Sequence, residues 1–64
     1  MNDRQRRILE YAVETGAVTS GWCREQFGVT YDTANRDLLA MIELGVLRRE
    51  GKGRASHYVP SRDD

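Results

Sequence analysis

Residues 27–47, FGVTYDTANRDLLAMIELGVL, decide the fold of this chain. Thr30 is a good helix N-cap because its hydroxyl accepts a hydrogen bond from a free backbone N–H of the first turn. Asp32 adds negative charge at the positive end of the helix dipole. Apolar residues then recur at the spacing of one helix face, at Ala34, Leu38 and Met41. Gly45 follows on the same face, where a left-handed helix end favours glycine, so the stretch predicts a helix over about residues 30–44.

A second helix is expected just before this stretch. Thr19 or Ser20 caps it and Phe27 ends it, with Cys23 and Phe27 spaced to face the core together. Gly28 then lies in a tight turn that leads into the capped helix. A helix, a short glycine turn and a second capped helix are typical of the helix-turn-helix motif.

The chain begins with another predicted helix, from about Asp3 to Glu14, capped by Asn2 or Asp3 and ended by Gly16. Its inward stripe is expected at Ile8, Leu9 and Tyr11 or Ala12. Asp3 and Arg7 have the spacing of a surface ion pair. The basic residues of the first turns therefore have two interpretations, a solvated face or a helix end that contacts phosphates, and these residues are Arg4, Arg6 and Arg7.

Residues 46–59, VLRREGKGRASHYV, predict a two-stranded hairpin. By alternation Leu47 faces the core and Arg48 faces outward. The glycines of residues 51–54 supply the positive φ of the turn. The return strand is expected to end before Pro60, which has no N–H for a ladder. Ala17-Val18-Thr19 predicts a short third strand beside this hairpin.

The signature VTYDTANRDL at residues 29–38, followed by the hairpin GKGRASHYV at residues 51–59, resembles small bacterial winged helix-turn-helix domains. Such domains occur in DeoR-like transcription regulators and at the C-termini of Fic-type and RecG-helicase-related proteins. The resemblance covers roughly Arg4 to Val59. It implies a mainly α fold with a small β-wing, in the α+β class, with the order α-β-α-α-β-β. The domain then spans residues 1–60, with a flexible tail over residues 61–64.

The resemblance implies sequence-specific binding of double-stranded DNA in transcription regulation. The helix over about 30–44 is then the recognition helix in the major groove, and residues 48–57 form a wing on the backbone. The expected DNA-binding residues are Tyr31, Thr33, Asn35, Arg36, Arg49, Lys52 and Arg54. Arg36 suits guanine and Asn35 suits adenine. Asp32 departs from the basic residues common in DNA-binding relatives and has the spacing of an ion pair with Arg36.

Charge is unevenly distributed along the chain although the net charge is zero. Residues 1–45 carry five arginines and seven acids, which sum to −2, whereas residues 46–59 carry four basic residues and one acid, which sum to +3. The basic hairpin is either a phosphate-contacting wing or a solvated turn. Asp37, beside Arg36, is expected to bond an arginine of a nearby helix or of the wing and thereby fix the orientation of its helix.

Other classes of function find little support in the sequence. No catalytic grouping or phosphate-binding loop appears, so neither an enzyme nor a small-molecule substrate is predicted. Cys23 and His57 are single and far apart, so no metal or cofactor is expected. One cysteine excludes an internal disulfide, and no apolar run reaches membrane-spanning length, which together favour the cytoplasm and no membrane partner.

A different class of function stays open beside DNA binding. The helix face around Leu39 and Ile42 is unusually apolar, and Trp22 lies off the core stripe of its own helix. This apolar surplus is either core or a surface for a homodimer or for the rest of a larger parent chain. A protein-interaction winged helix is therefore the alternative to a DNA-binding one.

Overall fold

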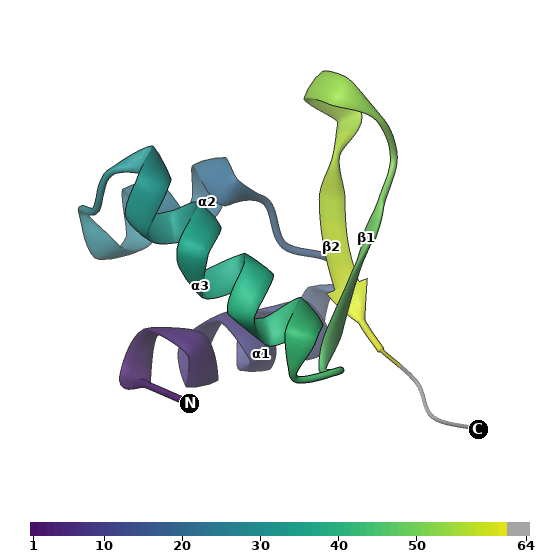
Figure 1. The fold of residues 1–64 in the computed structure, drawn as a ribbon, viewed down its shortest axis with the longest axis horizontal. Coiled ribbons are helices and arrows are strands. Elements are labelled where there is room, and N and C mark those ends of the chain that lie inside the picture. Colours follow the sequence, from purple (N-terminus) through teal and green to yellow (C-terminus); the bar gives the residue numbers. More distant parts are fainter. Residues whose placement is uncertain (62–64) are drawn as a thin grey trace.

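The computed structural model describes residues 1–61 and belongs to the α+β class (Figure 1). Three helices come first: α1 (Asp3–Thr15), α2 (Ser20–Phe27) and α3 (Tyr31–Glu43). Two antiparallel strands follow, β1 (Leu47–Glu50) and β2 (His57–Pro60), with a short 3-10 turn over Gly53–Ala55 between them. Figure 1 shows the helices gathered on one side, with the hairpin tip extending away from them.

Each helix begins at a side-chain cap. Asn2 Oδ1 accepts from the backbone N–H of Gln5 at 2.7 Å, and the Gln5 side chain accepts from the backbone N–H of Asn2 at 2.9 Å, which makes a reciprocal capping box. Thr19 and Thr30 cap α2 and α3 through their hydroxyls. Gly16 ends α1 in the left-handed conformation, at φ 94°. The predicted helix starts and stops are thus confirmed to within a residue.

The core forms where the three helices meet the hairpin. Its buried hydrophobic residues are Ile8, Ala12, Val18, Cys23, Ala34, Leu38, Met41, Leu47 and Tyr58. The face predicted for α3 is therefore confirmed. Trp22 lies at the core edge, where its ring stacks on Tyr11 with centroids 3.9 Å apart, and Phe27 meets it edge-on.

The expected third strand is wrong in extent. Val18 makes a single antiparallel bridge to Tyr58, with both backbone hydrogen bonds at 2.8 Å, and the sheet has two strands in the described residues. The next hydrogen-bonded position along β2 is Pro60, which has no N–H to donate, and Gly16 opposite it is already the helix cap of α1. In this direction the bridge cannot grow into a strand, and in the other direction Ser20 already begins α2.

Pairing between β1 and β2 runs further than the sequence predicts. Pro60 belongs to β2 opposite Leu47, and the Ser61 N–H donates to the Val46 carbonyl at 2.9 Å. Because hydrogen-bonded pairs alternate, the nitrogen of Pro60 faces away from β1, so proline does not interrupt this pairing. Residues 62–64 of the predicted tail lie outside the described residues.

The predicted ion pair between Asp3 and Arg7 is also wrong. Arg7 instead contacts Glu10 at 2.9 Å, and Asp3 lies 3.8 Å from Arg6. Both contacts join residues three apart, the other spacing that brings helix side chains together. All of these side chains are well exposed, so the exchange of partners changes little in stability.

Candidate nucleic-acid interface

A groove lies between α3 and the hairpin, with the start of α2 at one end. Its walls are Tyr31, Asn35 and Leu39 of α3, the hairpin residues Arg49, Gly53, Arg54, Ser56 and Tyr58, and Thr19, Ser20 and Gly21. Four of the predicted DNA-binding residues thus meet on one surface, although they come from two separate segments. These four are Tyr31, Asn35, Arg49 and Arg54.

Local geometry explains why these side chains converge. Tyr31, Asn35 and Leu39 are spaced four residues apart, which aligns them along one side of α3. On β1, Arg49 shares the face of buried Leu47 by alternation and lies opposite Tyr58 in the register. The Arg49 guanidinium donates to Ser56 Oγ at 3.0 Å, which holds it across the hairpin.

The groove is basic although the chain as a whole is neutral. Two arginines line it, and no aspartate or glutamate of residues 1–61 does. Within residues 1–61, the cations that have a carboxylate partner are Arg4, Arg6, Arg7 and Arg48. Every basic residue predicted to bind DNA is outside that set. The predicted contact residues Arg36, Arg49, Lys52 and Arg54 therefore keep their full charge available to an anion.

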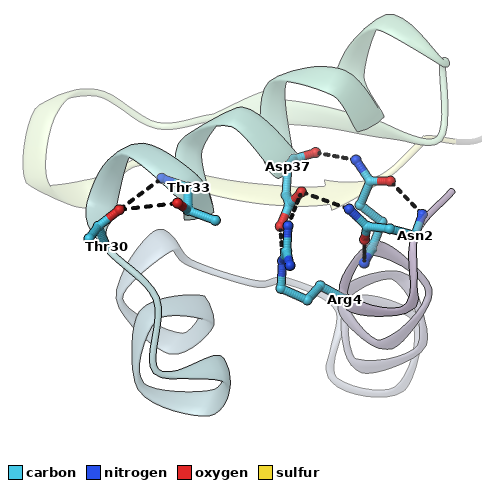
Figure 2. Close-up of polar contacts among 6 residues, drawn as sticks. Asn2, Arg4, Thr30, Thr33 and Asp37 are labelled. Carbon is cyan, nitrogen blue, oxygen red and sulfur yellow. Dashed lines mark hydrogen bonds and ion pairs between the residues drawn. The ribbon is translucent and has the colours of Figure 1, made fainter.

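The other three predicted site residues lie outside the groove walls. Arg36 is exposed on the side of α3 opposite the core, and Lys52 is exposed at the hairpin tip. Thr33 is half-buried, and its hydroxyl lies 3.1 Å from the capping hydroxyl of Thr30 (Figure 2). The geometry of Thr33 therefore fits a role in starting α3.

Asp37 is the charged residue whose environment is most constrained. It is 6% exposed, and it accepts from Arg4 Nε at 2.7 Å and from Asn2 Nδ2 at 3.2 Å (Figure 2). The Gln5 side chain donates to its backbone carbonyl at 3.3 Å. The predicted arginine partner is thus found, and it belongs to α1. The roles of Asn2 and Gln5 were missed, since only their helix-capping pattern is visible in the sequence.

The pKa of Asp37 reflects opposing influences. Burial raises it, but the hydrogen bonds from Arg4 and Asn2 and the positive charge of Arg4 together outweigh burial, so the pKa lies below its ordinary value. Asp37 is therefore a carboxylate at neutral pH. The Asp37 carboxylate forms its ion pair with Arg4 of α1 and not with neighbouring Arg36.

Cys23 is buried in the core, and His57 lies at the start of β2. Burial, with a smaller contribution from the charge of Asp37, raises the pKa of the Cys23 thiol to about 11, so the thiol is protonated at neutral pH and unsuited to nucleophilic attack. His57 Nδ1 lies 2.9 Å from the Ala55 carbonyl, within the hairpin. Among residues 1–61 there is no group of three or more metal-ligating side chains, and no helix is long and apolar enough to cross a membrane.

The three apolar residues of the alternative surface have different exposures. Trp22 and Ile42 are partly buried and pack against the core. Leu39 is 50% exposed and lies at the groove. The three side chains therefore do not form one exposed patch.

No protein-family model matches the chain, and no curated protein matches it either.

Proposed function

We propose that this chain is a winged helix-turn-helix domain that binds double-stranded DNA with sequence specificity. In this proposal α2 and α3 form the helix-turn-helix, α3 is the recognition helix and the hairpin is the wing. The groove between α3 and the hairpin supports it most, because in a chain of zero net charge this groove is lined by two arginines and by no acid among the described residues. A polyanion is the partner that such a surface attracts most strongly.

The arrangement of donors suits a duplex. With α3 in the major groove, Asn35 offers the amide that pairs with adenine, and Arg36 offers the fork that pairs with guanine. Arg49, Lys52 and Arg54 then face the flanking phosphates from the hairpin, where they set register without reading sequence. Tyr31, exposed at the start of α3, contributes a hydroxyl for a phosphate.

One domain of this size makes few base contacts, so useful discrimination of a genomic site requires two copies on two half-sites. The proposal therefore includes a homodimer, or a larger parent chain that supplies a second DNA-binding unit. We include a role in transcription regulation in the proposal, because sequence-specific binding of DNA is what such a role requires.

The test is a fluorescence-anisotropy titration of a labelled random-sequence duplex over a range of salt concentrations. Arg49→Ala and Arg48→Ala form a matched pair, because both remove one arginine from β1 but only Arg49 lines the groove. We expect the magnitude of the slope of log affinity against log salt to decrease by about 0.9 for Arg49→Ala, because one phosphate contact is lost. The slope should change little for Arg48→Ala.

Two results would contradict the proposal. Equal slopes for both variants would mean that the groove is not the contact surface. Absence of binding at low salt, together with salt-insensitive self-association through the exposed Leu39, would favour the protein-interaction alternative.

A further inference from the structure

Asp32 is the feature of α3 that the proposed function does not explain. It lies in the first turn, exposed, one turn before Arg36 on the side away from the core. Within residues 1–61 its carboxylate forms neither a hydrogen bond nor an ion pair, so the pair with Arg36 that its spacing predicts is not formed. An unpaired negative charge therefore lies at the N-terminal end of α3, the end that would enter the major groove of DNA in the proposed function.

Helix stability alone gives a weak reason for this charge. An acid in the first turn interacts favourably with the helix dipole, but α3 already has its Thr30 cap. In the major groove the same carboxylate faces repulsion from phosphates and from the acceptor atoms of guanine, adenine and thymine. The groups of the DNA major groove that can donate to a carboxylate are the amino groups of adenine and cytosine, and cytosine, unlike adenine, presents no acceptor atom of its own there.

We propose, resting on the DNA-binding function above, that Asp32 and Arg36 together read a G·C step. Arg36 donates to guanine O6 and N7, while Asp32 accepts from the amino group of cytosine N4. Residues four apart on a helix have Cβ atoms about 5–6 Å apart. Stacked base pairs are about 3.4 Å apart, so the two side chains span one pair or two neighbouring pairs.

This assignment makes Asp32 a specificity-determining residue. On a sequence without cytosine at the matching position, its carboxylate meets the acceptor atoms of guanine or thymine, or an adenine amino group with the N7 acceptor beside it, and binding is weaker. On a sequence with cytosine, the hydrogen bond offsets the repulsion. Asp32 thereby lowers the affinity for random DNA. It raises the ratio of the affinity for the correct site to the affinity for other sites, because it penalises binding to the other sites.

The experiment begins with selection of preferred duplexes by the unaltered chain from a random pool. Each selected cytosine facing the contact is then replaced by 2-pyrimidinone, which lacks the N4 amino group, and affinity is measured for three proteins. Asp32→Ala removes the carboxylate. Glu43→Ala is the matched control because it removes an equal charge from an exposed position near the other end of α3.

We expect the unaltered chain and Glu43→Ala each to lose at least about fivefold in affinity on the altered duplex, and Asp32→Ala to lose less than about twofold. Asp32→Ala is also expected to bind random duplex at least about twofold more tightly at low salt than Glu43→Ala does. Because all three proteins meet the same altered base pair, any change in the duplex itself cancels.

The results that overturn the inference differ from those that overturn DNA binding. Salt-dependent binding with no preference for cytosine, or equal losses for Asp32→Ala and the unaltered chain, would overturn the role of Asp32 alone. Failure of the unaltered chain to bind any duplex would overturn both proposals.

Discussion

Arg4 of α1 and Asp37 of α3 are joined by two hydrogen bonds, from Nε to Oδ2 at 2.7 Å and from Nη2 to Oδ1 at 3.3 Å. A paired fork of this kind fixes orientation as well as distance. Because Asp37 directly follows Arg36, this contact sets how α3 lies on α1 and thus where Arg36 is presented. The geometry of the proposed interface depends on a residue at the other end of the chain.

Replacing Asp37 with asparagine is expected to lower the free energy of unfolding by about 1–3 kcal/mol, because the charged acceptor for Arg4 and Asn2 is lost. Urea denaturation at neutral pH measures it. Arg7→Ala is the control, since it breaks only the exposed contact with Glu10 and should cost under about 1 kcal/mol. Equal costs would show that the Asp37 network does not hold the helices together.

The pH dependence of stability follows from the lowered pKa of Asp37. Its stabilising contribution is complete above the ordinary aspartate pKa of about 3.9 in the unfolded chain, and it is lost as the pH falls through the lower pKa of the folded state. We therefore expect the difference in unfolding free energy between the unaltered chain and Asp37→Asn to shrink below about pH 4. Parallel pH profiles for the two proteins would refute this assignment.

The Cys23 thiol is expected to be unreactive in the folded chain. Burial and the pKa of about 11 reduce the thiolate fraction roughly a hundredfold relative to an ordinary thiol with a pKa of 9.0. The rate of alkylation by iodoacetamide at neutral pH should therefore rise at least about a hundredfold when urea unfolds the chain. A native rate near that of free cysteine would mean that the site is open to solvent.

The hairpin tip depends on Gly51. Its φ is +84°, and a side chain there would overlap the backbone carbonyl of Ala55. Gly53 also has a positive φ, of +55°, but faces open space. Gly51→Ala is thus expected to lower stability by more than the roughly 1–2 kcal/mol expected for Gly53→Ala from backbone conformation alone.

Thermal unfolding followed by circular dichroism compares the two glycine variants. If Gly51→Ala were as stable as Gly53→Ala, the close approach of residues 51 and 55 would not exist in solution. In the proposed function Gly51→Ala should also weaken DNA binding, because Lys52 and Arg54 lie at the same tip.

Much of the fold is predictable because its signals are local. Thr19, Thr30 and Gly16 mark helix ends through their own backbone and side-chain chemistry, and Ala34, Leu38 and Met41 mark a buried face by spacing alone. The failed third strand depends on a non-local condition. The segment around Val18 has the sequence of a strand, but its pairing with β2 cannot extend past Pro60, which lies 42 positions away from Val18 in the sequence.

The candidate site likewise combines features that are visible in the sequence with features that depend on how the elements pack. The basic residues of the hairpin are visible in the sequence, and so is the stripe of α3 that carries Asn35. The convergence of Tyr31 and Asn35 with Arg49 and Arg54 is a property of the packing of α3 against the hairpin. The sequence also does not show which arginines pair with a carboxylate. Arg48 and Arg49 are neighbours, yet Arg48 pairs with Glu50 and Arg49 bonds Ser56.

In the proposed function, duplex DNA contacts the groove between α3 and the hairpin. The most direct measurement is the change in backbone amide NMR shifts when an unlabelled duplex is added to the isotope-labelled chain at low salt. We predict that the largest changes occur at Tyr31, Asn35, Arg49 and Arg54 and fade as salt is raised. Changes confined to the opposite side of the hairpin, around Val13, Arg48 and Val59, would contradict the claim.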